Sequence, residues 1–559
     1  MVSAIKQNLF ILIIILILGV YLGIKAFDEN GWDGWGFASA QVIISNEYWI
    51  RDGFVKNYFL QQIYPYSKIT RYLDYPEFRN RSIDDLGGNI SRGRVYYTHY
   101  PPLYLVPYFI LQKAGITQRA LLRLFALSIS LLALYFFYRF IKLVANKKIA
   151  IIASLYYGFS VTFLNYADSV QTPPWSALSM FLIMTLGILA CNNFENQKKY
   201  RRYNLIIWGA YFISSLLSYD VTFYIFAYLV LLDIFILKKF LWKKWLLWAS
   251  APVLGFALQI IQNTWYLGPS DMVNDLSNVY ANRTFRGFKN FVVGLIAPFY
   301  SMTSIKTVFI FKKTIVTLAS AIAIIVSLRE ISRRERNFGQ KIGLNFNYFK
   351  IIFILAIAAI TQPFFINATG GWPYQGVLAA PFWGLLIGAA SIFIMNIFKQ
   401  KESGTYKTIS FGILTAIVLM LWSVQFYSTL AYVKDWPNNR PSQKIIDFSK
   451  TIQSMEPGKE KVAFRIMPQD PIWKNQFPVF YFEYYLGMLK IDFANRRDLL
   501  VDFWWLRKTS EYPFYSFIIA DNKTEIENIR DEIKKTLPKK SVSEIKNIEG
   551  QYVFIVSPK

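Results

Sequence analysis

The stretch "LFILIIILILGVYLGIKAF", residues 9–27, is almost entirely apolar. A helix needs about 20 apolar residues to cross the hydrocarbon core of a bilayer, so this run is long enough to span. It lacks a small-residue cleavage site and is followed by further apolar runs, which favours an uncleaved membrane helix over a signal peptide. Because Lys6 precedes the run, we expect its start to be cytoplasmic.

The overall composition agrees with a membrane protein. Hydrophobic residues make up 54% of the chain, with 48 Phe, 37 Tyr and 16 Trp. Soluble domains are roughly 45–50% apolar and lack repeated runs of spanning length. The sequence therefore predicts a polytopic α-helical membrane protein. One cysteine and one histidine exclude a disulfide framework and a Cys- or His-rich metal site.

The net charge of +26 is explained by where the basic residues lie. They cluster in short gaps between apolar runs, which is the positive-inside pattern of cytoplasmic loops. We therefore expect membrane lipids as partners and no nucleic acid. The clusters fall in Arg139–Lys148, Lys198–Arg202, Lys238–Lys244, Arg329–Arg336 and Lys399–Lys407.

These clusters also determine how residues 100–115 are threaded. If this proline-broken run spanned the membrane, every later basic cluster would fall outside. The run is shorter than the ~20 residues of a spanning helix, and Pro101 and Pro102 suit a helix start. We therefore expect an interfacial or re-entrant helix that closes a first external loop, 27–119.

Residues 1–434 are predicted to form a transmembrane domain of about eleven helices. A second external segment, 264–305, ends in a short run that we expect to re-enter the membrane. The predicted spans are 8–26, 120–142, 149–166, 173–191, 203–219, 221–237, 244–263, 307–328, 350–366, 376–398 and 408–430.

Residues 435–559 have a different character. Strand-like "KVAFRIM", "SFIIAD" and "YVFIVS" alternate with the helical pattern "KTEIENIRDEIKKTL". Such alternation predicts a small α/β domain. The number of preceding spans places this domain on the extracytoplasmic side, beside both external loops.

Acidic residues gather at the same predicted face. Asp28, Glu29 and Asp33 directly follow the first helix in "FDENGWDGWG", and Asp168 follows the run 149–166. Carboxylates at the end of a membrane helix are costly unless they are paired or used, although a solvated turn would also accommodate them. Asp220 lies in a short turn between two spans, and by itself we interpret it as a helix N-cap.

A carboxylate pair without a histidine or cysteine nucleophile suits general-base catalysis. One carboxylate would accept a proton from an acceptor hydroxyl or amine while that group attacks. A departing phosphate would need cations, and arginine binds phosphate well. The outer-face candidates are Arg92, Arg94, Arg283, Arg286 and Lys289, for which lipid headgroup contact is an equal alternative.

The order of these motifs resembles a known family. An acidic motif after the first helix precedes "SNEYWIRDG", "THYPPLY" and "YADSVQTPPWSALSMF". This order is similar to the GT-C glycosyltransferases of the protein O-mannosyltransferase and aminoarabinose-transferase type (glycosyltransferase family 39-like). Those enzymes carry an Asp-Glu-type motif, a His/Lys-Pro-Pro-Leu motif and a second acid before a proline-containing helix. The resemblance covers residues 8–200 by motif and the rest by topology.

The resemblance implies an inverting glycosyltransferase in the cell membrane. It would move a sugar from a polyprenyl-phosphate donor to a lipid, glycan or protein acceptor on the periplasmic or extracellular side. It implies catalytic acids among Asp28, Glu29, Asp33 and Asp168, with the base being either Asp28 or Asp33. The implied donor-phosphate site contains Arg94, His99, Tyr100, Arg283 and Arg286.

Two positions depart from the family pattern. Tyr100 occupies the place of the family's cation, and His99 lies one residue earlier. Asp168 stands several residues before Pro173, where Gln171 and Thr172 fill the intervening positions next to the proline. The roles of His99 and Asp168 are therefore left open by the motifs.

The main alternative function is a transporter or a lipid or polysaccharide flippase. Transporters place ionisable groups at mid-membrane, commonly in repeated halves with broken helices. In this sequence the spans are nearly free of acids, and no repeat is visible. The sequence indicates no certain cofactor or metal site, and a loosely held Mg²⁺ or Mn²⁺ at the carboxylates is compatible with it.

Overall fold

The computed structural model describes most of the membrane domain and the two ends of the C-terminal region. The described residues are 2–28, 32–62, 88–91, 94–98, 100–284, 288–303, 310–334, 348–366, 373–400, 409–435, 443–457, 461–466, 489–493 and 515–558.

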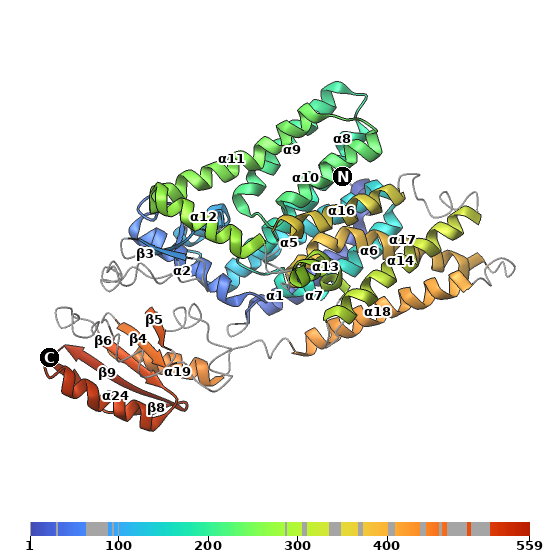
Figure 1. The fold of residues 1–559 in the computed structure, drawn as a ribbon. Helices are drawn as coiled ribbons and strands as arrows, with labels where there is room; N and C mark the ends of the chain where they lie inside the picture. Colours follow the sequence, from blue (N-terminus) through green and yellow to red (C-terminus); the bar gives the residue numbers. More distant parts are fainter. Residues whose placement is uncertain are drawn as a thin grey trace.

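The molecule is dominated by a bundle of long apolar helices (Figure 1). Within the described residues, seven helices are long and apolar enough to cross a membrane. This confirms the predicted polytopic helical membrane protein. The bundle contains α1 (Val2–Ala26), α5 (Arg119–Val144), α6 (Lys147–Gly158), α7 (Val161–Tyr166), α8 (Thr172–Asn192), α9 (Gln197–Leu217), α10 (Thr222–Leu232), the π-helix η3 (Asp233–Leu237), α11 (Trp242–Leu267), α13 (Phe288–Thr303), α14 (Ile310–Arg334), α16 (Tyr348–Phe365), η5 (Pro373–Gln375), α17 (Gly376–Gln400) and α18 (Ile409–Asp435).

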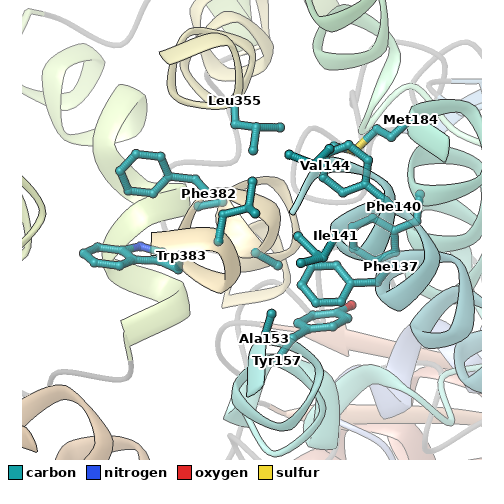
Figure 2. Packing of buried hydrophobic residues seen from close by; sticks show 14 of the residues in the cluster. Phe137, Phe140, Ile141, Val144, Ala153, Tyr157, Met184, Leu355, Phe382 and Trp383 are labelled. Atoms are coloured by element: carbon teal, nitrogen blue, oxygen red, sulfur yellow. The ribbon is translucent and has the colours of Figure 1, made fainter. Parts of the chain in front are cut away.

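The core of the bundle is built around α5 and α17. The Phe137 ring of α5 packs against Tyr157 of α6, with their centroids 5.0 Å apart, and lies on the side of α17 opposite to Trp383 (Figure 2). The helices approach closely because Gly384 has no side chain: a Cβ there would lie 2.8 Å from Cζ of Phe137. Such close packing orients the helix ends, where polar residues collect.

The predicted span 149–166 is two helices rather than one. α6 ends at Gly158, and α7 begins after Ser160, whose Oγ accepts a hydrogen bond from the Phe163 N–H at 3.1 Å. A serine that binds nearby backbone groups competes with the helical pattern, which explains the break. The break lets the chain between α7 and α8 turn inward at Asp168.

The first loop forms a small layer of its own. It contains α2 (Gly36–Asp52), β1 (Gln61–Gln62), β2 (Gly88–Ser91), β3 (Arg94–Tyr97), η2 (Pro102–Tyr104) and α4 (Leu105–Lys113). Trp49 Nε1 donates to the Leu60 carbonyl at 2.9 Å, and Gln112 Nε2 donates to the Ile43 carbonyl at 3.3 Å. As predicted, α4 is too short to cross a membrane, with 9 residues.

The C-terminal region contains the predicted sheet and helix. β4 (Lys461–Ile466) pairs in parallel with β5 (Leu489–Phe493) and β6 (Tyr515–Ala520), and β6 pairs antiparallel with β9 (Gln551–Pro558). β7 (Lys540–Val542) and β8 (Lys546–Ile548) also pair with β9. α19 (Gln443–Ser454) buries Ile445 and Phe448 against this sheet, and α24 (Lys523–Thr536) contacts β6 and β9. Figure 1 shows the sheet as a body beside the helical bundle.

Candidate functional site

Asp168 is the centre of a buried ion cluster. Lys25 Nζ lies 3.0 Å from Asp168 Oδ1, and Arg123 Nε donates to Asp168 Oδ2 at 2.9 Å. Arg123 Nη2 also contacts Oδ2. Burial alone would raise the pKa of Asp168, but Arg123 and Lys25 outweigh it and hold that pKa below its ordinary value. Asp168 is therefore an ionised carboxylate at neutral pH.

This cluster joins four segments that are distant in sequence. Lys25 lies in the last turn of α1, Arg123 lies in the first turns of α5, and Asp168 follows α7. The Leu164 carbonyl of α7 accepts from Lys25 Nζ at 3.1 Å and from the Tyr432 hydroxyl of α18 at 3.0 Å. Sequence reasoning missed Lys25 and Arg123, although charges inside apolar runs are a visible signal of a paired or functional site.

Asp33 is held next to this cluster by hydrogen bonds from its own loop. The Trp35 N–H donates to Asp33 Oδ1 at 2.6 Å, and Ser39 Oγ donates to Oδ2 at 2.7 Å. The side chain is nearly buried. Burial first, and then the Asp168 carboxylate, raise the pKa of Asp33 above its ordinary value. The two acids thus differ in environment, and their pKa values move in opposite directions.

Ser39 and Gly34 fix the first loop to the segment that carries Asp168. Ser39 Oγ accepts from the Val170 N–H at 3.0 Å and lies 3.4 Å from Ser169 Oγ. The Gly34 N–H donates to the Asn165 carbonyl at 2.8 Å. A Cβ on Gly34 would lie 2.4 Å from the Asn165 amide nitrogen, so a side chain at this position would require the Asn165 amide to move.

Asp28 lies at a different place in the loop. Its backbone carbonyl accepts from Arg119 Nη2 at 3.1 Å, and the Arg119 guanidinium stacks over the Trp32 ring at 4.4 Å. Asp28 is partly exposed, whereas Asp33 is nearly buried beside Asp168. Of the two acids that the motifs left open, Asp33 is the one whose carboxylate is oriented by donors on both oxygens.

The structure does not describe the side chains of seven predicted site residues. Glu29, Arg92, His99 and Arg286 lie outside the described residues. For Arg94 in β3, for Arg283 in α12 (Pro269–Thr284) and for Lys289 in α13, the structure describes the backbone and not the side chain.

Thr98, the residue before His99, is held by hydrogen bonds to two helices. The Thr98 carbonyl accepts from Gln259 Nε2 at 2.8 Å and from Asn263 Nδ2 at 2.9 Å, both on α11. Thr98 Oγ1 donates to Asp275 Oδ2 of α12 at 2.7 Å. The double-proline motif is therefore attached to α11 and α12, which places β3 and α12 close together.

Asp220 is not the helix N-cap that we predicted. The N-cap of α10 is Val221, without a capping side chain. Gln362 Oε1 of α16 instead accepts from the Phe223 N–H at 2.9 Å. A partner from another helix thus replaces the local cap, and this leaves the Asp220 carboxylate available for other groups.

The Asp220 carboxylate is surrounded by hydroxyl groups. The Tyr100 hydroxyl donates to Oδ1 at 2.8 Å, and the Tyr374 hydroxyl lies 3.3 Å from the same oxygen. Thr172 Oγ1 lies 3.3 Å from Oδ2. Tyr100, predicted to stand in the family's cation position, therefore connects the double-proline motif to Asp220.

Within the described part of the chain, no group of three or more His, Cys, Asp or Glu side chains is arranged to hold a metal ion. A Mg²⁺ or Mn²⁺ ion remains a prediction of the sequence.

No protein-family model and no curated protein sequence matches the chain. Solved structures do match. ArnT from Cupriavidus metallidurans, solved bound to undecaprenyl phosphate, is similar at a TM-score of 0.55 and 11% identity, covering 99% of this chain and 98% of ArnT. The apo state of the same protein gives a TM-score of 0.53 with the same coverage. An archaeal oligosaccharyltransferase, AglB from Archaeoglobus fulgidus, gives 0.48 at 13% identity over 92% of this chain and 70% of AglB.

The chain therefore shares its fold with ArnT, a protein of the aminoarabinose-transferase type that the order of its motifs resembles. The full-length likeness is to ArnT, whose fold includes both the membrane helices and the C-terminal part of this chain.

Proposed function

We propose that this protein is a membrane glycosyltransferase that transfers a sugar from a polyprenyl-phosphate donor to an acceptor. The observation that carries this proposal is the oriented, nearly buried Asp33 carboxylate beside the Asp168 ion cluster. Its setting is a fold shared over nearly the full length with ArnT, which binds undecaprenyl phosphate. The acceptor would be a lipid, a glycan or a protein.

In this mechanism Asp33 is the general base. The acceptor oxygen or nitrogen attacks the anomeric carbon and loses its proton to Asp33, while the carbon–oxygen bond to the phosphate breaks. The polyprenyl phosphate leaves with the bonding electrons, and the anomeric configuration inverts. Asp168 is a positioning residue, because Lys25 and Arg123 occupy its oxygens.

The ion cluster supports this role through its charge. Lys25 and Arg123 contribute two positive charges and Asp168 one negative charge. Asp33 adds a second negative charge when it is deprotonated, as a general base must be before it acts. Uptake of a proton by Asp33 would leave the cluster with one net positive charge. This positive charge on the cluster develops in the same step in which the polyprenyl phosphate leaves as an anion. The attraction between the two charges would stabilise the products of the transfer.

We propose that five residues bind the donor phosphate: Arg94, His99, Tyr100, Arg283 and Arg286. The support is the attachment of the double-proline motif to α11 and α12, which brings the backbone carrying Arg94 near the helix carrying Arg283. The planar guanidinium group of arginine can donate two parallel hydrogen bonds to a phosphate, which the ammonium group of lysine cannot do.

The direct test is a transfer assay on membranes that contain the full chain. A labelled polyprenyl-phosphate sugar should lose its label to an acceptor, and the label should stay in the lipid when Asp33 is replaced by Asn. Movement of the labelled lipid across the bilayer without transfer would instead favour the transporter alternative. Absence of both activities with a panel of sugars would count against the proposal.

We also propose that the site and the C-terminal domain face the periplasm or the cell exterior. Cysteines introduced at exposed Ser277 and Lys535, in a chain with Cys191 replaced by Ala, should react with a membrane-impermeant maleimide in intact cells. A cysteine at exposed Lys198 is the matched control and should react only after permeabilisation. If only the cysteine at position 198 reacted in intact cells, the topology would be the opposite of the proposed one.

A further inference from the structure

The turn between α9 and α10, which contains Tyr219 and Asp220, is fastened to two neighbouring helices. Gln362 of α16 donates through Nε2 to the Tyr219 carbonyl at 2.8 Å and accepts through Oε1 from the Phe223 N–H at 2.9 Å. The Tyr219 hydroxyl donates to Gln259 Oε1 of α11. Because these bonds come from two helices, the Asp220 carboxylate has a defined position relative to both.

The double-proline motif is bound to this turn on both sides of residue 99. Gln259, which accepts from Tyr219, also donates through Nε2 to the Thr98 carbonyl at 2.8 Å. Asp220 Oδ1 accepts directly from the Tyr100 hydroxyl at 2.8 Å. Two adjacent residues of the turn thus hold two residues of the motif, so a displacement of the turn would displace the motif with it.

The same carboxylate oxygen also faces the aromatic rings that pack on the Asp33 loop. The Tyr374 hydroxyl of η5 lies 3.3 Å from Asp220 Oδ1. The centroid of the Tyr374 ring lies 4.8 Å from that of Trp35, whose backbone N–H donates to Asp33 at 2.6 Å. Asp220 is therefore one bond and one ring contact away from the loop that carries the candidate base.

The second carboxylate oxygen of Asp220 faces the segment that follows Asp168. Thr172, the first residue of α8, is buried, and its Oγ1 lies 3.3 Å from Asp220 Oδ2. One side chain thus lies where the double-proline motif, the rings on the Asp33 loop and the segment after Asp168 meet.

We propose that Asp220 is a positioning residue that holds the double-proline motif and the Asp33 loop at the separation that sugar transfer requires. The inference rests on the proposed function, because it gives Asp220 a part in that reaction. Asp220 acts through Tyr100 and Tyr374 and not on the reacting atoms. A displacement of about 1 Å between reacting groups can lower a rate by about a hundredfold, so such a residue would control turnover from a distance.

This role requires hydrogen-bond acceptors at position 220 and no proton uptake. Asp220→Ala removes both oxygens, and we expect it to raise the donor KM by about tenfold and to lower kcat by up to about a hundredfold. Asp220→Asn keeps an acceptor oxygen for the two tyrosine hydroxyls and should recover most of this loss. Loss of folded protein alone would lower the apparent turnover at an unchanged donor KM.

Asp233→Asn is the matched control, because Asp233 is a buried acid at the other end of the same helical segment. Its carboxylate accepts from Lys244 Nζ at 2.6 Å and from Trp245 Nε1 at 2.8 Å, and neither partner belongs to the candidate site. We expect this variant to unfold at a lower temperature than the wild type and to keep the wild-type donor KM.

Tyr374→Phe is a second variant for the case in which Asp220→Ala does not fold. It removes one hydroxyl from Asp220 and keeps the ring that packs on Trp35. We expect kcat to fall by up to about tenfold, the scale of one hydrogen bond to a charged group. A Tyr374→Phe variant with wild-type kcat would count against the inference.

Amide hydrogen exchange of the full chain in detergent tests the inference without any substrate. Asp220→Ala should speed exchange in the peptides that contain Tyr97 and Leu103, on either side of the motif. Asp220→Asn and Asp233→Asn should leave these peptides as in the wild type. Wild-type exchange or a wild-type donor KM in Asp220→Ala would overturn the inference. If exchange changes as expected but the wild type transfers no sugar, the proposed function fails and the hold of Asp220 on the motif stands.

Discussion

Asp33→Asn is expected to lower turnover by about a hundredfold or more, the usual scale of a lost general base. Asparagine keeps the size of the side chain and one acceptor oxygen, which can still accept from the Trp35 N–H. Its NH₂ group would face Ser39 Oγ, which can accept a hydrogen bond as well as donate one. What it removes is the ability to take up a proton. The measurement is kcat for transfer from a labelled polyprenyl-phosphate sugar, with protein folding checked by thermal unfolding.

The pH profile gives this prediction a second readout. A base must be deprotonated to work, so activity should rise with pH through the pKa of Asp33. Because that pKa is raised, the acid limb should lie above the value of about 3.9 of an ordinary aspartate. The residual activity of Asp33→Asn should lack this limb.

Asp28→Asn is the matched control for this experiment. Asp28 belongs to the same loop, and its backbone carbonyl, which accepts from Arg119 Nη2 at 3.1 Å, is unchanged by the substitution. We expect less than a fewfold loss of turnover. If Asp28→Asn is the inactive variant and Asp33→Asn is close to the wild type, the assignment of the base is reversed.

Asp168→Ala is expected to destabilise the protein strongly. It would leave Lys25 and Arg123 buried without the carboxylate that both of them contact, and breaking a buried ion pair typically costs about 3–5 kcal/mol. Thermal or denaturant unfolding of the protein in detergent measures this loss. In the wild type the lowered pKa of Asp168 means that its contribution is present above about pH 4 and is lost as pH falls through the lowered pKa.

A double-variant cycle distinguishes charge balance from packing. Arg123→Met leaves one buried cation paired with one anion, so it should cost less than Asp168→Ala does. Combining the two should cost clearly less than the sum of the single effects, because one unpaired cation is then removed. Asp271→Ala, at an exposed position, should change stability by less than about 0.5 kcal/mol. Additive costs, or an Asp168→Ala variant as stable as Asp271→Ala, would mean that the cluster contributes no net electrostatic stability.

Some features of the site could be read from local sequence and some could not. The acidic motif after the first helix and the acid after residue 166 were both found, but the motif spacing fits Asp28 and Asp33 equally well. The structure separates them because Ser39 and Gly34 attach only one part of the loop to the Asp168 segment. Asp220 was misinterpreted because its cap was judged locally, whereas Gln362 comes from a helix about 140 residues away in sequence, as the Phe223 bond shows.

The sequence by itself determined that this chain is a polytopic helical membrane protein and that a sheet follows its helices. Apolar length and strand alternation are properties of contiguous residues, so burial in lipid or in a small core can be read from them directly. Only the tertiary structure decided which charges meet. Lys25 and Asp168 are 143 residues apart, and their pairing depends on how α1 packs beside α5 and α6. The energy of a buried charge is set by its distance to partners, and no local pattern encodes that distance.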